Sequence, residues 1–314
     1  MKKVFKLLTL FFSVSFLNAD WVNENINYPF NPDAILFEND AKEFEKYEEC
    51  SKVANSTIQA FIDNIQSGNV VDYCYNNMPL SWKIYLKTIS PQFADSIGKD
   101  IINKVNELLF LCGDICLNQS EFLMATIDKE EYPLFSNKSD YENFGELLKK
   151  LSLTLTYNNL KKSNLEEIAK SCVFKPQFSE VKYFISNSYI HNFPYALAEL
   201  PYYQSVPVVE SVFVYYYMAT HGDVMAERVI LPMVYIENKW VPLELANNFN
   251  TYFIKDTPEF LEEVNEYVKE NKDKILVGLN GLIALVTDLS KETDKNLFTA
   301  KFKAIEFFIS TTFE

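Results

Sequence analysis

The hydrophobic pattern of this chain changes near residue 173, and that change limits the folds that the chain can adopt. Before it, apolar residues recur at helical intervals, most clearly from Phe93 to Cys112. After it, residues 173–188 and 206–218 are rich in β-branched and aromatic residues, which favour strands. Helical spacing returns at Thr257-Pro258 and continues to the end. The pattern predicts an α+β protein that is mostly helical, with a small curved antiparallel meander sheet in its C-terminal half.

Helix boundaries follow from caps and prolines. Met78-Pro79 precedes one expected helix, and Ser90-Pro91 is typical of a cap followed by proline at the first helical position. That second signal predicts a separate helix with one apolar face from Phe93 to Cys112. Residues 151–156 alternate like a strand, but their neighbours favour a helix. Further helices are expected at 119–126, 141–151, 164–171, 260–270, 274–289 and 295–308.

Three strands joined by short turns form the expected meander. They cover residues 212–219, 224–236 and a segment that begins at Trp240, with turns at 220–223 and 237–239. Pro232 lies inside the second strand, which indicates a bulge or an unpaired edge there.

The first nineteen residues predict a secretory signal peptide. Three lysines stand among the first six residues, an apolar run follows at 7–16, and Ala19 offers a small residue at the cleavage point. A spanning helix needs about 20 apolar residues, roughly twice the length of this run. We therefore expect a periplasmic or secreted protein with no transmembrane segment after cleavage.

Four regions are expected along the chain. Residues 1–19 are the signal peptide, 20–172 a helical domain, 173–255 the antiparallel sheet region, and 256–314 C-terminal helices that pack on the rest.

Charge and glycine content exclude several function classes. The formal charge is −14, so the surface repels nucleic acid and anionic headgroups. A basic protein would be the complementary partner. Only seven glycines are present, and none of them cluster as phosphate-binding loops require. No cofactor is predicted.

Five cysteines stand at positions 50, 74, 112, 116 and 172. In an oxidising compartment this odd number predicts one or two disulfides and at least one unpaired thiol. Cys112 and Cys116 share one face if their segment is helical, which is poor geometry for a bridge.

Catalytic and metal-binding motifs are missing from the sequence. His191 and His221 are the only histidines, and no zinc motif or G-x-S-x-G motif occurs. We predict no metal site and assign no catalytic residue, although a hydrolase with dispersed catalytic residues stays open.

One constellation in the meander could bind a ligand. A two-residue turn at His221-Gly222 would place Tyr215 opposite Arg228, with Tyr217 on the same face. An arginine beside two tyrosine rings could form a cation–π platform or hold a carboxylate. The alternative is a cross-strand pair that only stabilises the sheet.

The segment 236–243 resembles the closing hairpin of sheets in the nuclear-transport-factor-two-like (cystatin-related) superfamily. The matching residues are Asn238, Lys239, Trp240 and Val241, with asparagine where glycine is usual because it tolerates positive φ. The resemblance covers residues 173–245 and implies a sheet that curls around a pocket. Leu80-Ser81-Trp82, together with the later Lys239–Pro242, also resembles exported bacterial proteins with a helical first half.

These observations favour non-enzymatic binding of an apolar or amphipathic ligand such as a lipid. The expected ligand-binding residues are Tyr215, Tyr217, Arg228 and Trp240, and some exported members of the resembled superfamily carry lipids. A protein–protein interaction factor of the envelope or the secreted space is the alternative.

Overall fold

The computed structural model describes residues 56–57, 60, 63–64, 67–127, 137–175, 182–184, 191–200, 203–218, 224–249 and 257–313. The predicted signal peptide and Cys50 lie outside these residues. The helices are α3 (Val70–Asn77), α4 (Leu80–Ile97), α5 (Lys99–Asn118), α6 (Ser120–Thr126), α7 (Lys138–Thr154), α8 (Tyr157–Lys161), α9 (Leu165–Ser171), α10 (Leu243–Asn248), α11 (Thr257–Leu289) and α12 (Lys295–Phe313). The strands are β1 (Lys182–Phe184), β2 (His191–Leu200), β3 (Tyr203–Met218), β4 (Val224–Ile236) and β5 (Lys239–Pro242).

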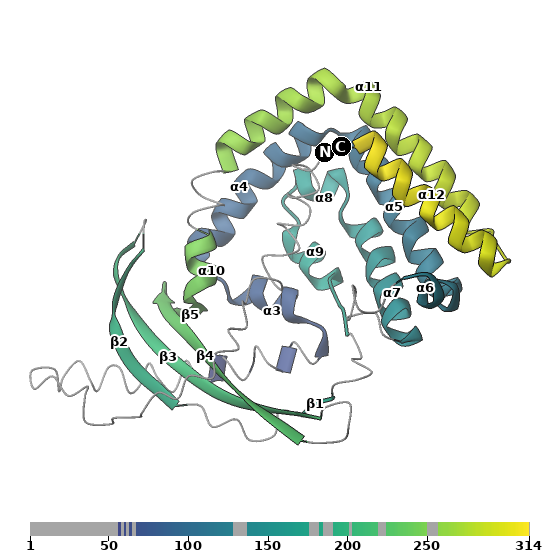
Figure 1. Cartoon of the computed structure of the whole chain (residues 1–314). Helices are drawn as coiled ribbons and strands as arrows, with labels where there is room; N and C mark the ends of the chain where they lie inside the picture. Colours follow the sequence, from purple (N-terminus) through teal and green to yellow (C-terminus); the bar gives the residue numbers. More distant parts are fainter. Residues whose placement is uncertain are drawn as a thin grey trace, which may run out of the picture.

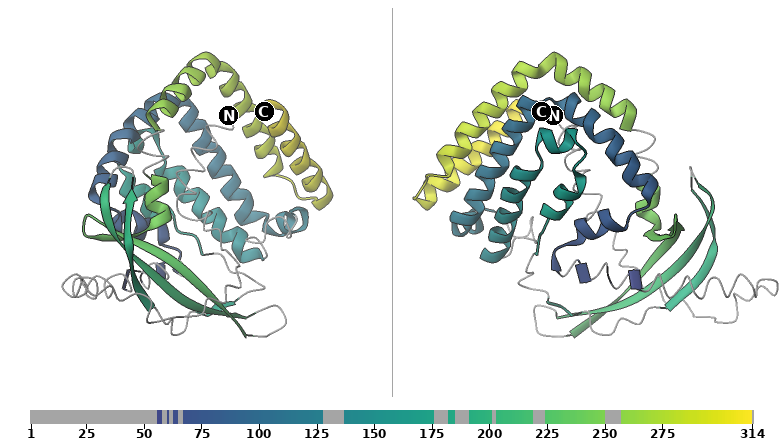
Figure 2. Two further views of the ribbon diagram at one scale, coloured as in Figure 1. Left: turned by 60° about the vertical axis from the view of Figure 1, so that its left-hand side comes forward. Right: turned by 180° about the vertical axis from the view of Figure 1, so that it is seen from behind.

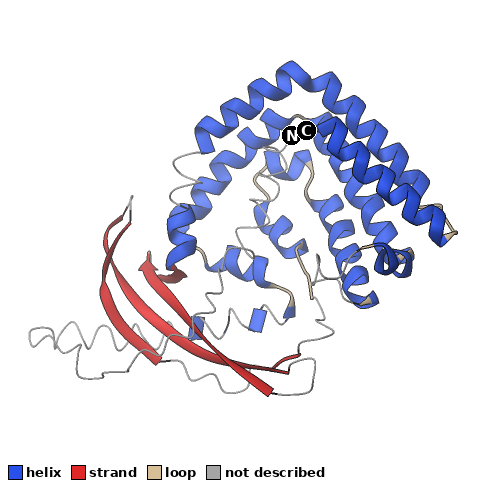
Figure 3. Ribbon diagram, in the orientation of Figure 1, coloured by secondary structure: helices blue, strands red, loops and turns tan. Residues whose placement is uncertain are grey.

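The helices form an arch, and a curved sheet lies beneath its open side (Figures 1 and 2). The sheet is antiparallel throughout, in the order β1-β3-β4-β5, and β2 also pairs with β3. Figure 3 shows the strands gathered on one side of a mostly helical molecule. The α+β prediction is therefore confirmed, and β3, β4 and β5 form the expected meander.

The bend between α4 and α5 corrects the prediction of a helix start at Ser90-Pro91. Pro91 lies inside α4, and the helix ends at Ile97. The break falls at Gly98, whose φ of 85° and ψ of 148° suit glycine and few other residues. The apolar spacing from Phe93 to Cys112 is helical as predicted, but it continues across two helices.

Ser90 and Pro91 instead join α4 to α8. The Ser90 hydroxyl, fully buried, donates to the Leu160 carbonyl at 2.7 Å. Pro91 has no N–H for the carbonyl of Lys87, four residues earlier. That carbonyl accepts a hydrogen bond from the Ser163 hydroxyl at 2.7 Å. The polar groups released by the proline are thus satisfied by the neighbouring segment.

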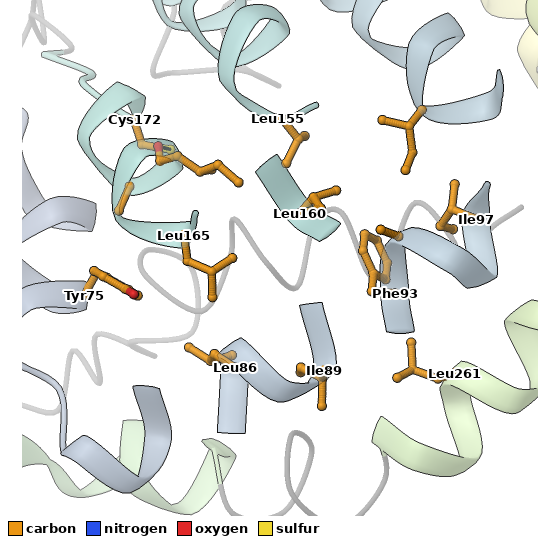
Figure 4. Packing of buried hydrophobic residues seen from close by; sticks show 14 of the residues in the cluster. Tyr75, Leu86, Ile89, Phe93, Ile97, Leu155, Leu160, Leu165, Cys172 and Leu261 are labelled. Carbon is orange, nitrogen blue, oxygen red and sulfur yellow. Dashed lines mark hydrogen bonds between the residues drawn. The ribbon is translucent and has the colours of Figure 1, made fainter. Parts of the chain in front are cut away.

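Two apolar clusters form the described core. The first joins helices α3 to α5, α7 to α10 and the part of α11 up to Leu279 to β4 and β5. Figure 4 shows part of it, including Phe93, Leu160 and Leu261. The second joins α5, α6 and α7 to the end of α11 and to α12, with Phe298 fully buried at its centre. Because α11 runs through both clusters, it ties the two halves of the arch together. The prediction of two helices at 260–270 and 274–289 is wrong, since α11 is continuous over 33 residues.

Helices α5 and α7 cross at two glycines. A Cβ atom on Gly113 would lie 2.8 Å from the Gly145 carbonyl oxygen, and a Cβ on Gly145 would lie 2.8 Å from the Gly113 oxygen. Such distances are too short for real contacts, so both glycines are needed for this close approach. Lys149 on α7 and Asp114 on α5 form an ion pair of 2.8 Å beside the crossing.

No disulfide forms among the described cysteines. Cys74, Cys112, Cys116 and Cys172 are all free. Cys112 and Cys116 both lie in α5, as their spacing suggested, and do not bridge.

Candidate functional site

The β4–β5 hairpin turns at Glu237 and Asn238, which have φ values of 50° and 62°. Positive φ at both central residues is the backbone of a two-residue turn whose twist suits an antiparallel pair. The predicted turn and the tolerance of Asn238 for positive φ are therefore confirmed. The turn sets the register in which Tyr235 pairs with Trp240 and Ile236 pairs with Lys239.

Glu237 also anchors the hairpin to the helical arch. Its Oε2 accepts a hydrogen bond from the backbone N–H of Ser81 at 3.0 Å, in the first turn of α4. Pro79 occupies the cap position of α4 and supplies no side-chain hydrogen bond. A carboxylate at this end satisfies an exposed N–H and complements the helix dipole.

The two faces of the hairpin pack differently. Val234, Ile236 and Val241 belong to the core cluster that includes Trp82 and Phe249. The rings of Trp82 and Phe249 are stacked, with centroids 4.3 Å apart. This face of the sheet is therefore fixed to α4 and α10.

Alternation along the strands puts Met233, Tyr235 and Trp240 on the opposite face. Met233 is 2% exposed and Trp240 is 4% exposed, while Tyr235 is half-buried. The rings of Tyr235 and Trp240 are 5.0 Å apart and tilted by 46°. These three side chains make a largely buried aromatic and thioether layer on the face away from the helical core.

The indole N–H of Trp240 is the unusual feature of this face. Its Nε1 is buried and has no hydrogen-bond partner among the described residues. A buried tryptophan N–H usually finds an acceptor, and an unpaired buried donor costs about 1–3 kcal/mol. Trp240 therefore holds one unused donor within a buried apolar layer.

The register separates the four residues predicted to bind a ligand. Tyr215 pairs with Glu227, and Arg228 pairs with Val214, so the expected pairing of Tyr215 with Arg228 is wrong by one residue. The reason is the β3–β4 connection, in which Met218 pairs with Val224 and five residues separate the strands instead of two. A shift of one residue exchanges the faces of a strand.

Arg228 consequently stands at a position on the Val234 face, whereas Tyr215 and Tyr217 stand at positions on the Trp240 face. The shared-face argument for a cation–π platform no longer holds. The partner of Tyr215 on β4 is Glu227, which is eight residues before Tyr235. At about 3.3 Å per residue, this separation along the strand is about 26 Å. Among the residues whose side chains the structure describes, Tyr235 and Trp240 are in ring contact.

Thiol chemistry is suppressed in the described part of the chain. Burial raises the pKa of Cys74, Cys116 and Cys172 to about 12 and that of Cys112 to about 11. These thiols stay protonated near neutral pH and are poor nucleophiles. The described residues also hold no group of three or more histidine, cysteine, aspartate or glutamate side chains that could bind a metal.

Two residues of the site were not predicted from the sequence. Met233 follows Pro232 in a strand and carries no motif, and Glu237 reaches α4 across 156 residues. The hairpin turn and Trp240 were the signals in the sequence that pointed to this part of the chain.

No family model, curated protein or solved structure matches this chain. Within the described ranges, no single helix is long and apolar enough to cross a membrane. By length and composition alone, one pair of described helices reaches that threshold together, α5 with α6, and the two are bent by 91°.

Proposed function

We propose that this protein binds an amphipathic ligand on the Trp240 face of its sheet, in the periplasm or outside the cell. The observation that carries the proposal is the buried, unpaired indole N–H of Trp240. A ligand with a carboxylate or phosphate oxygen would accept this hydrogen bond. Its apolar part would lie along Met233 and the ring of Tyr235.

The chemistry of the face favours binding over catalysis. One neutral donor among apolar groups can orient a ligand, which is typical of small-molecule sites with few polar contacts. A catalytic site would need a nucleophile or an acid–base pair near the ligand. Neither Met233 nor the ring of Tyr235 supplies an activated nucleophile.

Ligand binding can be measured by titrating the purified protein with decanoate and, separately, with lysophosphatidylcholine. Trp240→Phe keeps an aromatic ring and removes the N–H, so the affinity should fall about tenfold or more, as expected for a hydrogen bond to a charged acceptor. Trp82→Phe removes an indole from the helical core and should lower stability while leaving the affinity unchanged. Mass spectrometry of a solvent extract should also reveal co-purified lipid.

Two results would count against the proposal. One is an empty extract together with no thermal shift from either ligand. The other is equal affinity of the wild-type protein and Trp240→Phe, which would mean that the N–H takes no part.

A further inference from the structure

Helix α12 carries an apolar stripe on its exposed side. The stripe consists of Leu297, Ala300, Ala304 and Phe307, which are all exposed; Leu297 is 55% and Phe307 is 70% exposed. Spacings of three, four and three residues keep these positions on one side of the helix. The buried side of α12, with Phe298 and Ile305, packs into the second core cluster. This helix is therefore apolar on two sides, and only one of them is covered by described residues.

Helix α11 extends this exposed surface. Two contacts fix the antiparallel alignment of α11 and α12: Phe308 lies against Gly281, and Lys301 pairs with Asp288 at 2.8 Å. In this alignment Ala284 on α11 lies level with Ala304 and its neighbour on α12. Ala284 and Val277 are exposed, Val277 by 72%.

Helix geometry places both sets on the same side of the pair. At 100° per residue, the α12 stripe is centred about 70° from the side that meets α11, and Val277 and Ala284 lie about 40° from the side that meets α12. Both sets are rotated in the same direction, each counted along its own chain from the side that meets the other helix. Because the two helices are antiparallel, rotations in the same direction bring both sets to the same face of the helix pair. The α11–α12 face is thus one continuous apolar surface, formed by Val277, Ala284, Leu297, Ala300, Ala304 and Phe307.

We infer that a second copy of this chain docks on the α11–α12 face, with the two α12 helices antiparallel about a two-fold axis. The stripe is self-complementary in that arrangement. Residue 302 is the midpoint both of Leu297 and Phe307 and of Ala300 and Ala304. When Leu297 of one copy lies opposite Phe307 of the other, Ala300 therefore lies opposite Ala304. A two-fold interface requires this kind of self-complementarity.

The sizes of the side chains also suit a pair of helices. The two alanines stand at the centre of the stripe, where they permit helix axes to approach within about 8 Å. Leu297 and Phe307 stand at its ends, where each fills the space beside the other copy. A partner of another sequence would not require this symmetric order of large, small, small and large side chains.

Charge opposes the association and gives it a distinctive salt dependence. Each copy carries −14 in formal charge, and the exposed Lys303 flanks the stripe in both copies near the axis. Lys301 is already paired with Asp288 and Glu292. Since the attraction is apolar and the repulsion is electrostatic, added salt should strengthen the dimer by screening the like charges.

Analytical ultracentrifugation of the purified protein over a range of concentrations tests the inference. The wild-type protein should dimerise, and more tightly at higher salt. Phe307→Asp and Ala304→Glu should each raise the dimer dissociation constant about tenfold or more, as for a residue that the interface buries. Leu153→Asp is the matched control, because Leu153 is equally exposed, at 72%, but lies on α7. It should dimerise as the wild type does, and circular dichroism should show that all variants fold.

A cysteine cross-link tests the antiparallel alignment. A mixture of Leu297→Cys and Phe307→Cys proteins should form a disulfide-linked dimer on mild oxidation, whereas Leu297→Cys alone should not. A wild-type protein that stays monomeric at every concentration and salt level would overturn the inference. So would stripe variants that dimerise normally, or a different protein that occupies this face while the chain itself remains monomeric. None of these results bears on ligand binding at Trp240.

Discussion

At the scale of single residues, Gln119 shows how one amide can complete a distant helix. Its Nε2 donates to the carbonyls of Leu289, Ser290 and Glu292 at 3.3, 3.3 and 2.7 Å. These carbonyls lie at and just beyond the end of α11, where a helix leaves acceptors unpaired. A residue between α5 and α6 therefore caps α11 across 170 to 173 positions, which no local sequence signal could indicate.

Replacing Gln119 should separate hydrogen bonding from charge. We expect Gln119→Ala to lower the free energy of unfolding by about 1–2 kcal/mol through the lost hydrogen bonds. Gln119→Glu should cost about 2–3 kcal/mol, because it also places a negative charge at the negative end of the α11 dipole. Urea denaturation measures both values. A glutamate variant as stable as the alanine variant would show that the dipole has no effect here.

The buried thiols give a prediction about pH. Their pKa values are raised above the ordinary 9.0 by burial, to about 11 for Cys112 and about 12 for Cys172. A group whose pKa is raised on folding contributes stability below its unfolded pKa and loses that contribution as pH rises through the folded value. The protein should therefore lose stability between pH 9 and 12. The Cys172→Ala variant should lose less stability between pH 7 and pH 12 than the wild-type protein loses over the same range.

Reactivity toward an aromatic disulfide reagent provides the second measurement. In a Cys50→Ser background at pH 8, the folded protein should react slowly, and the unfolded protein should react at four thiols. A fast-reacting thiol in the folded state would contradict the burial of these side chains.

At the scale of helices and strands, local spacing was a better guide than start and stop signals. Residues 151–154 are helical in α7, as their neighbours indicated despite the alternating pattern. The Ser90-Pro91 signal failed because tertiary hydrogen bonds from Ser90 and Ser163 make a proline tolerable inside α4. The predicted register of β3 and β4 was wrong because a glycine between two strands does not reveal how many residues connect them.

The α5–α7 crossing depends on two glycines, and alanine substitution tests it. Alanine is favoured over glycine in a helix by about 1 kcal/mol, but at Gly113 its Cβ would meet backbone oxygen. We expect Gly113→Ala and Gly145→Ala to destabilise the protein by about 1–3 kcal/mol, as overpacking does.

Gly281→Ala is the control for that experiment. Its Cβ would meet the outer end of the Phe308 ring at 2.9 Å, which can turn aside more easily than backbone. Its cost in thermal or urea unfolding should be smaller than that of Gly113→Ala. An equal or larger cost would mean that the backbone contact at the crossing is not decisive.

At the scale of the whole molecule, the described side chains that join the sheet to the arch belong to the β4–β5 hairpin. The Val234, Ile236 and Val241 side chains enter the main core, and Glu237 holds the start of α4. The sequence predicted the hairpin and the α4 start separately. Their contact depends on the tertiary fold, so it could not be predicted from either segment.

Glu237 variants should reveal how strongly the sheet is attached. Glu237→Gln keeps an acceptor for the Ser81 N–H and loses the charge, whereas Glu237→Ala loses both. The expected order of stability is wild type, then glutamine, then alanine, with a total range of about 0.5–1.5 kcal/mol. Hydrogen exchange should show faster exchange in β5 and the first turn of α4 in the alanine variant. Unchanged protection there would mean that apolar packing alone holds the hairpin.

The continuous course of α11 also affects the chemical lifetime of the protein. Asn280-Gly281 lies within this helix, and Asn-Gly is the dipeptide most prone to deamidation in flexible chains, where the glycine nitrogen attacks the asparagine amide. In a helix that nitrogen is held in its backbone hydrogen bond and directed along the axis. A break in α11 at this point would have left a site of spontaneous deamidation in the middle of the helix.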